Sequence, residues 1–243
     1  MNKPCVVGLL TGRGNNTLKD KNILDLLGKP VLFYPANAGK QARSINRLFV
    51  SSDDPAILNA AAQYGYEAII RPTELATPTA QHIDAIWHAL SVMDERGVNP
   101  DVLVVILANN ITIQSEWIDD CIQLMLDDST LSAVVPVYMD SDHHPFRAKR
   151  LLPNGKLDVF VQSDGHISTN RQDLEPSFFL CHNFWVLNVH MLNDASKSGQ
   201  PPWTFMGNDV KAYRVHGSID IHDEFDLRVA AQWLHHTREG GKV

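Results

Sequence analysis

The strongest chemical signal in the sequence is a basic, glycine-containing loop near the amino terminus, TGRGNNTLKDKN. It follows a short apolar run and contains two glycines and three cations: Gly12, Arg13, Gly14, Lys19 and Lys21. Glycines let backbone N–H groups approach an anion closely, and Arg13 and Lys21 can add charge-assisted hydrogen bonds. In an open α/β sheet, ligands bind beyond the carboxyl ends of the strands, which is where this loop would lie. The loop therefore predicts a phosphate site.

Two common phosphate motifs do not describe this loop. Thr17 stands where the third glycine of a GxGxxG dinucleotide fingerprint belongs, and no GK[ST] follows as it does in a P-loop. A solvated glycine turn with incidental basic residues is an alternative interpretation, because short motifs also occur by chance. The loop alone thus indicates an anion site without naming the nucleotide.

The composition limits the partners of such a site. The 243 residues carry 21 lysines and arginines against 28 aspartates and glutamates, a net charge of −7. This charge argues against a nucleic-acid backbone or an anionic membrane as the main partner. The three widely spaced cysteines, Cys5, Cys121 and Cys181, predict neither a disulfide framework nor a zinc site. This cysteine usage makes the cytoplasm the expected location. The first apolar run is too short for a signal peptide, and no later run reaches the length of a membrane span.

A sheet must position the loop, and short β-branched runs alternate with helical patterns through the first half of the chain. The predicted strands are Cys5–Leu10, Arg47–Ser51, Glu67–Ile70, Val102–Leu107 and Ala133–Tyr138. Helices are predicted at 57–64, after an Asp-Asp-Pro start signal at 53–55, at 81–96, and at 115–126 with Ser115 as its cap. This alternation predicts an α/β fold with a doubly wound, mainly parallel sheet, in one domain over residues 1–243.

The segment 139–177 breaks this rhythm, because it is polar and rich in proline and glycine. We interpret it as an insertion into the α/β domain. The last third of the chain returns to predicted strands at 183–188 and 211–215 and to a closing helix at 224–235.

Five segments carry a likeness to a known family, in the family's order. They are GRGNNTLKDKN at 12–22 followed by LGKP at 27–30, VSSDD at 50–54, RPTELATPTA at 71–80, DHHPF at 142–146 and SIDIHDEFDL at 218–227. Together they resemble the CMP-sugar synthetases, the cytidylyltransferases that activate sialic acids and 3-deoxy-manno-octulosonate, and the CMP-sialic acid branch in particular. The resemblance implies a Rossmann-like nucleotidyltransferase fold and CMP transfer from CTP to an acidic sugar, with release of pyrophosphate. It also implies that the insertion is an arm that builds a homodimer and lends residues to the partner's acceptor site.

The resemblance assigns residues to the nucleotide half of the site. It implies that Arg13 binds the triphosphate and that Lys21 is the loop lysine beside it. Both residues are then catalytic, because they neutralise charge on the leaving pyrophosphate. The implied nucleotide-binding residues are Leu10, Gly12, Arg13, Gly14, Asn22, Arg71, Pro72, Glu74, Ala80 and Gln81.

Asp220 matches the family's first metal-binding aspartate, so the resemblance implies a Mg²⁺ site there, with Mn²⁺ as a substitute. The family's second aspartate is His222 in this sequence, and imidazole suits Mg²⁺ poorly. Asp223 lies one residue on and could bind the metal directly or through water. An acidic helix start is the alternative interpretation of Asp220, Asp223, Glu224 and Asp226, and it is the one we adopt for Asp226.

The acceptor half departs from the family. A glutamine that contacts the sugar is replaced by Ala108, and an arginine that helps to hold the sugar acid is replaced by Leu180. The candidate acceptor-binding residues are His82, Asn109, Asn110, Arg147, which aligns with a basic residue of the family's insertion, and His182. Asparagines at a strand end also commonly close a turn. The pattern predicts a retained nucleotide half and an altered acceptor half.

Two other functions stay open on these residues. Ala108 and Leu180 allow CMP transfer onto a non-sugar acid such as a phosphonate. His222 allows a nucleotide-binding regulatory protein that has lost turnover. A CTP titration with detection of pyrophosphate separates enzyme from binding protein.

Overall fold

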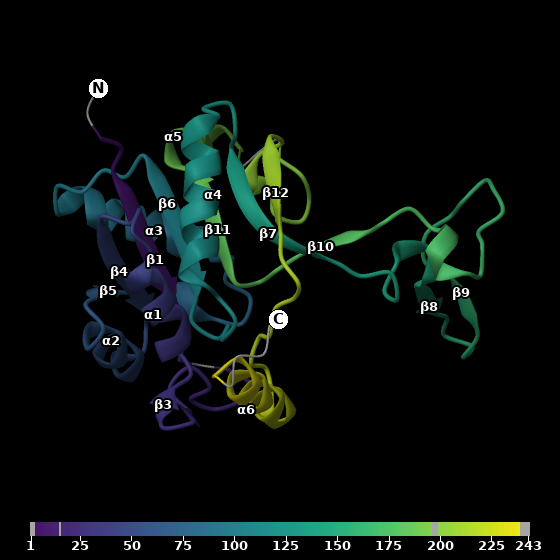
Figure 1. The fold of residues 1–243 in the computed structure, drawn as a ribbon, viewed down its shortest axis with the longest axis horizontal. Coiled ribbons are helices and arrows are strands. Elements are labelled where there is room, and N and C mark those ends of the chain that lie inside the picture. The colour runs from purple at the N-terminus through teal and green to yellow at the C-terminus, as the bar shows by residue number, and fades with distance from the viewer. Residues whose placement is uncertain (1–2, 15, 196–198, 239–243) are drawn as a thin grey trace.

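The computed structural model describes residues 3–14, 16–195 and 199–238. Among these residues the central sheet has eight strands in the order β10-β7-β11-β6-β1-β4-β5, with β12 also paired to β7. The strands are β1 (Val6–Thr11), β4 (Arg47–Ser52), β5 (Glu67–Ile70), β6 (Val102–Leu107), β7 (Ala133–Met139), β10 (Phe178–Leu180), β11 (Phe184–Asn188) and β12 (Val210–Arg214). Figure 1 shows the sheet at the centre of the molecule.

The strands β6, β1, β4 and β5 are neighbours and run parallel, as predicted. Leu10 of β1 lies opposite Val50 of β4 and Ile106 of β6. The carboxyl ends of these strands therefore meet at one edge, where the basic loop begins. The predicted mainly parallel sheet is confirmed, with the addition that β11 runs antiparallel to both β6 and β7.

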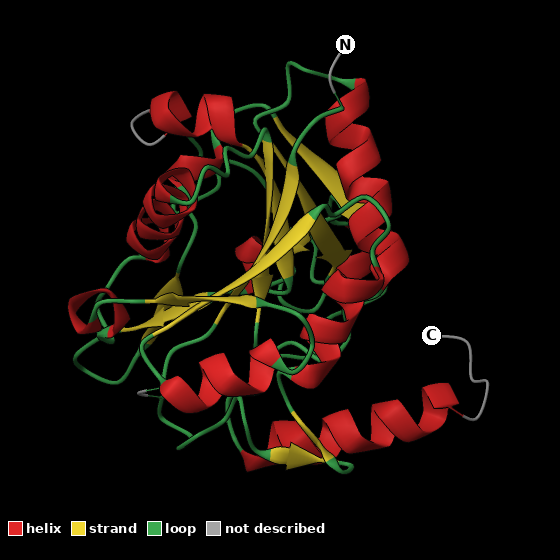
Figure 2. Cartoon of the chain, turned by 90° about the vertical axis from the view of Figure 1, so that its left-hand side faces the viewer, coloured by secondary structure: helices red, strands yellow, loops and turns green. Residues whose placement is uncertain are grey.

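Helices cover both faces of the sheet (Figure 2). One core contains Val6 and Leu10 of β1 together with side chains of α1 (Phe33–Gln41), α2 (Pro55–Ala62) and α4 (Ser115–Asp127). The other contains Val7 and Leu9 together with side chains of α3 (His82–Glu95) and α5 (Val189–Ala195). Alternate residues of β1 thus face opposite layers, which makes the sheet doubly wound. None of the helices in the described ranges is long and apolar enough to cross a membrane.

The predicted helix starts have different outcomes. At α2, the Asp54 carboxylate accepts the Ala56 N–H at 2.8 Å and Pro55 is the first helical residue, so the predicted cap is confirmed. At α4, the prediction that Ser115 is the cap is wrong. Gln114 occupies the cap position with extended backbone angles, and the hydroxyl of Ser115 donates to the Glu116 carboxylate instead.

Helix α1 was not predicted, because its sequence contains Pro35 and Gly39 and has few large apolar residues. It packs closely against the sheet through small side chains. A Cβ atom on Gly39 would lie only 2.7 Å from Cδ1 of Ile106, so this position needs glycine for close packing rather than for its backbone angles.

Between β7 and β10 the chain leaves the body of the molecule and forms a projecting arm, residues 140–177 (Figure 1). The arm contains an antiparallel hairpin of β8 (Lys149–Leu151) and β9 (Leu157–Val159). Large apolar side chains on it face solvent, with Leu151 73%, Leu157 69% and Phe160 59% exposed.

A third core joins the two segments that carry the predicted phosphate and metal residues. The small hairpin of β2 (Asp25–Leu26) and β3 (Lys29–Pro30) follows the basic loop, and α6 (Glu224–Arg238) follows the acidic segment. Leu26 and Val31 are buried together with Ala230 and Leu234 of α6. This packing holds the basic loop and the acidic segment at the same end of the molecule.

Candidate active site

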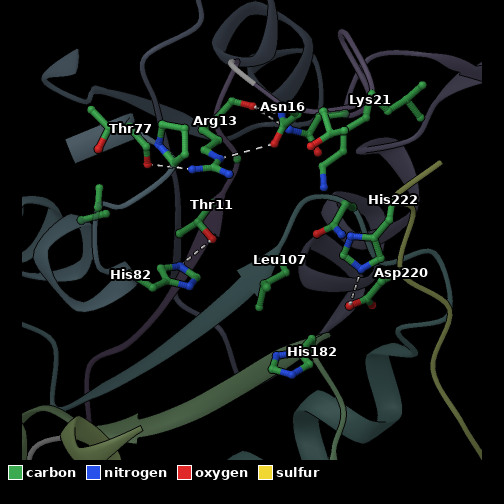
Figure 3. A pocket seen from close by; sticks show the side chains of 18 of the residues that line it. Thr11, Arg13, Asn16, Lys21, Thr77, His82, Leu107, His182, Asp220 and His222 are labelled. Atoms are coloured by element: carbon green, nitrogen blue, oxygen red, sulfur yellow. Dashed lines mark hydrogen bonds and ion pairs between the residues drawn. The ribbon is translucent and has the colours of Figure 1, made fainter. Parts of the chain in front are cut away.

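A cavity of about 790 Å³ lies at the carboxyl ends of the parallel strands (Figure 3). Figure 3 shows Arg13 and Thr77 on one side of it, Lys21, His222 and Asp220 on another, and His82 and His182 below. The predicted site residues that line the cavity are Gly12, Arg13, Lys21, Asn22, Arg71, Ala80, Gln81, His82, Asn109, His182, Asp220, His222 and Asp223.

Six predicted residues lie elsewhere. Leu10 is fully buried in the core, and Pro72 and Glu74 lie at and within the short 3₁₀ turn η1 (Thr73–Ala76). The other three are Gly14, Asn110 and Arg147, which are described below. Sequence analysis missed further lining residues, among them Thr11, Asn16, Leu75, Thr77 and Leu107. Asn16, Leu75 and Thr77 lie within the quoted motifs, so those motifs were the available signal.

Arg13 is held at the cavity by contacts between separate segments. Its Nη1 donates to the carbonyl oxygen of Thr77 at 2.7 Å, and its own carbonyl accepts from Nδ2 of Asn22 at 3.1 Å. The next part of the loop is tied to the end of β4, because the Gly14 N–H donates to Oδ1 of Asp53 at 3.0 Å. Gly14 therefore shapes the loop instead of lining the cavity. The arrangement keeps the guanidinium of Arg13 beside any anion bound there.

Two further cations line the cavity. Burial lowers the pKa of Lys21, and the nearby Asp220 carboxylate opposes this shift. The guanidinium of Arg71 donates to Oγ of Ser51 at 3.0 Å and to the Ser51 carbonyl at 2.7 Å, and burial lowers its pKa to about 10. Arg71 therefore stays protonated at neutral pH. Three cationic side chains face one cavity in a protein whose net charge is negative.

His82 lies on the opposite side of the cavity from Lys21. Its Nε2 is 3.1 Å from the hydroxyl oxygen of Thr11, and its ring centroid is 5.0 Å from that of Trp185. Burial lowers the pKa of His82 to about 4, and Arg71 and His182 act in the same direction. At neutral pH the imidazole is therefore uncharged, so it can offer a ligand a hydrogen bond but no positive charge.

His182 lies in the break between β10 and β11, which both pair with β7. Leu180 of β10 lies opposite Val137 of β7, and Val186 of β11 lies opposite Val134 of β7. The chain thus advances six residues from β10 to β11 while β7 advances only three. Such a bulge re-aims side chains. The exposed His182 ring packs against Trp203 with 5.2 Å between centroids. The half-buried Leu180 and the buried Ala108 do not line the cavity in the described part of the chain.

Arg147 lies on the arm, outside the cavity of its own chain. Its Nη1 donates to Oδ1 of Asp142 at 3.2 Å, and Arg171 donates to the same carboxylate at 2.8 Å. Within one chain, Arg147 therefore belongs to a surface ion-pair cluster.

The acidic segment presents one carboxylate to the cavity from a largely buried position. Burial raises the pKa of Asp220, and a hydrogen bond from Asn110 lowers it. Oδ2 of Asp220 is 3.9 Å from Nε2 of the exposed His222. Asn110 itself is fully buried and does not line the cavity, so the structure places it behind Asp220 rather than against an acceptor.

Asp223 has the helix-start role that the sequence analysis gave as its alternative interpretation. Its Oδ1 accepts the N–H groups of Phe225 at 2.8 Å and Asp226 at 3.0 Å. Oδ2 of Asp226 in turn accepts the N–H groups of His222 at 2.7 Å and Asp223 at 3.2 Å. This reciprocal pattern is a capping box at the start of α6. Asp226 thus acts at the helix start, as the sequence interpretation has it.

The donor set fits a Mg²⁺ ion that is held mainly by substrate. No cluster of three or more histidine, cysteine or acidic side chains that could hold a metal occurs within residues 3–14, 16–195 and 199–238. Mg²⁺ keeps several waters and often needs only one or two carboxylates besides phosphate oxygens. Asp220, a largely buried carboxylate beside Lys21 in the same cavity, meets this requirement.

Curated relatives share part of this chain. An N-acylneuraminate cytidylyltransferase of Escherichia coli O18:K1:H7 is 34% identical over 88 residues, 36% of this chain and 21% of that protein. A Helicobacter pylori protein named pseudaminic acid cytidylyltransferase and UDP-2,4-diacetamido-2,4,6-trideoxy-beta-L-altropyranose hydrolase is 23% identical over 168 residues, 69% of this chain and 31% of that protein. A pseudaminic acid cytidylyltransferase of Campylobacter jejuni serotype O:2 is 21% identical over 166 residues, 68% of this chain and 70% of that protein. The match thus spans less than a third of the first two proteins.

Solved structures share the fold. A CMP:2-keto-3-deoxy-manno-octonic acid synthetase complexed with CTP superposes with a TM-score of 0.72 at 16% identity, over 96% of this chain and 99% of that one. A 4-diphosphocytidyl-2C-methyl-D-erythritol synthase of Anaerococcus prevotii superposes with a TM-score of 0.66 at 12% identity, over 96% of this chain and 100% of that one. These likenesses confirm the predicted Rossmann-like nucleotidyltransferase fold.

A family model described as cytidylyltransferase matches residues 13–180, which is more than half of the chain. The match begins in the basic loop, includes the Arg71 segment and the arm, and ends in β10. Together with the cavity and the relatives it confirms the resemblance drawn from the sequence motifs: this chain belongs to the cytidylyltransferase family.

Proposed function

We propose that the protein transfers CMP from CTP to a small acidic sugar of the nonulosonic acid kind and releases pyrophosphate. The main support for this proposal is that the cations Arg13, Lys21 and Arg71 line the same cavity as the carboxylate of Asp220. Family membership supports CTP as the nucleotide, and the names of the relatives support an acidic sugar as the acceptor. In this proposal residues 1–243 act as one domain with the arm inserted.

The proposed step forms one bond and breaks one. A hydroxyl oxygen of the acceptor bonds to the α-phosphorus of CTP, and the bond from that phosphorus to the pyrophosphate oxygen breaks in line. The electron pair leaves with pyrophosphate and the hydroxyl proton goes to solvent. Arg13 and Lys21 stabilise the charge that develops on the leaving group. Arg71, fixed on Ser51, orients the nucleotide for the displacement.

Asp220 would hold Mg²⁺ against the triphosphate, and His222 would let Mn²⁺ substitute. The ion, when bound, supplies further positive charge to the phosphate oxygens. The largely buried position of Asp220 in the cavity and the proximity of Lys21, the residue implied to lie beside the triphosphate, support this assignment.

We also propose a homodimer, and the exposed apolar surface of the arm supports it. Its exposed apolar side chains, Leu151, Leu157 and Phe160, are of the kind that protein interfaces cover. In such a dimer Arg147 would serve the acceptor site of the partner subunit, where it would supply positive charge. The three free cysteines suit the reducing cytoplasm, which is the compartment we propose.

A phosphonate or another non-sugar acid is the second candidate acceptor. Ala108 and Leu180 favour it, because they replace the polar side chains that the sequence comparison expects for a sugar acid, and neither lines the cavity in the described part of the chain. A screen of acidic sugars and phosphonates with CTP and Mg²⁺, read out as pyrophosphate, tests the proposal. Release with an acidic sugar supports the first candidate, and release with phosphonates alone supports the second.

CTP should stabilise the protein more than ATP, GTP or UTP does. The reason is that the segment 71–80, implied to hold the base and ribose, lines the cavity and is tied to Arg13 through Thr77. Thermal unfolding with each nucleotide and Mg²⁺ measures this preference. Equal stabilisation by ATP would show that the segment 71–80 does not select the cytosine base.

N-acetylneuraminic acid should be a poor acceptor. Without the arginine that Leu180 replaces, the sugar carboxylate loses a charge-assisted hydrogen bond worth roughly 1.5–3 kcal/mol, or about ten- to hundredfold in affinity. Steady-state kinetics with this sugar and with the best acceptor of the screen provide the comparison. A kcat/KM for N-acetylneuraminic acid equal to that of the best acceptor would refute the argument.

A further inference from the structure

The side chain of Asn110 is fully buried and its two ends have different partners. Oδ1 accepts the backbone N–H of Thr112 at 3.0 Å and the hydroxyl of Thr112 at 2.9 Å. A backbone N–H can only donate, so the carbonyl oxygen of the amide must face Thr112. Nδ2 is thereby turned the other way, where it donates to Oδ1 of Asp220 and to Oγ of Ser218.

The backbone around this contact fixes it further. Asn110 and Asp220 form an antiparallel bridge. On either side of the bridge, the Ile111 N–H donates to the Ile219 carbonyl at 3.2 Å and the Ile221 N–H donates to the Asn109 carbonyl at 2.9 Å. The residues that follow β6 therefore hold the acidic segment in register, and Asn110 is the side chain that links them to the carboxylate.

We infer that Asn110 is a positioning residue for Asp220. Its amide occupies Oδ1, and Oδ2 remains on the side of His222, which lines the cavity. Oδ2 is thus kept in place for a cation, and no arginine or lysine of the described residues is ion-paired with it. The inference rests on the proposed function, because it assumes that Asp220 holds Mg²⁺ there, and it replaces the sequence interpretation of Asn110 as an acceptor-binding residue.

The test is the gain in CTP affinity that a divalent ion provides, measured by calorimetry without acceptor, once with Mn²⁺ and once with EDTA. Asn110→Ala should reduce this gain about tenfold or more, because Asp220 loses the hydrogen bond that orients it. Affinity in EDTA should stay within about twofold, since Arg13 and Arg71 are untouched. The electron paramagnetic resonance signal of Mn²⁺ in the CTP complex gives an independent measure of the bound ion.

Two further variants control the result. Ser218→Ala removes the other partner of the same amide and should leave the metal-dependent gain unchanged. Asn110→Ser keeps a buried polar atom for the Thr112 N–H but is too short to reach Asp220 as well, so it should lose the gain even if the alanine variant fails to fold.

The Asp220→Asn variant distinguishes a failure of the positioning role of Asn110 from a failure of the proposed metal site. If it loses the gain while both Asn110 variants keep it, the positioning role is overturned and the proposed function stands. If Asp220→Asn also keeps the full gain, the metal site of the proposed function fails, and the inference fails with it. Equal weakening of CTP in Mn²⁺ and in EDTA by the Asn110 variants would show a merely structural role and overturn the inference.

Discussion

Replacing Asp220 with asparagine should abolish pyrophosphate release at any practical Mg²⁺ concentration. Asp220 and Asp223 both line the cavity, but Oδ1 of Asp223 caps α6, and the imidazole of His222 is a poor Mg²⁺ ligand. The measurement is the metal concentration that gives half the maximal rate. An Asp220→Asn enzyme with normal metal dependence would remove this residue from the site.

Two neighbouring substitutions serve as matched comparisons for Asp220. Asp223→Asn can still cap α6 through its amide oxygen, so it should only raise the metal requirement. His222→Asp should reduce the advantage of Mn²⁺ over Mg²⁺, because it exchanges an imidazole for a carboxylate. Loss of folding in the asparagine variant at position 223 would mean that the cap, and not the metal, explains its effect.

Replacing Arg13 or Lys21 with alanine should lower kcat by at least about 100-fold. Under the proposed function, each change removes positive charge that acts on the transferring phosphate, and losses of this order follow removal of one such group. Circular dichroism should show an intact fold, since both residues lie in a polar loop outside the cores.

Lys19→Ala is the control for Arg13 and Lys21. Lys19 is exposed in the same loop and does not line the cavity, so its loss should leave the rate nearly unchanged. Folded Arg13 and Lys21 variants that keep the wild-type rate would show that the loop does not serve the triphosphate.

The parallel half of the sheet was predictable because its strands are short apolar runs separated by helix signals. Helix α1 was not, because its fit to the sheet depends on small residues such as Gly39 and on Ile106, which lies far away in the sequence. The cap of α4 was misplaced by one residue, since Ser115 and Gln114 both stand at the transition and only backbone angles distinguish them.

In the site, sequence motifs identified part of the lining within the basic loop and the 71–82 segment, and they missed Asn16, Leu75 and Thr77. They could not separate residues that face the cavity from those that support it. Asn110 follows a strand as Asn109 does, yet a contact with Asp220, 110 residues away, turns it inward. Asp223 follows Asp220 closely, yet the start of α6 uses one of its oxygens.

The most direct test of CMP transfer follows the phosphates of CTP. With CTP labelled in the α-phosphate and an active acidic sugar, the label should enter a cytidine-containing adduct of the acceptor. With CTP labelled in the γ-phosphate, an equal amount of label should appear in pyrophosphate. Tight binding of CTP without either product, across the full set of acidic acceptors, would contradict the account and leave a nucleotide-binding protein without turnover.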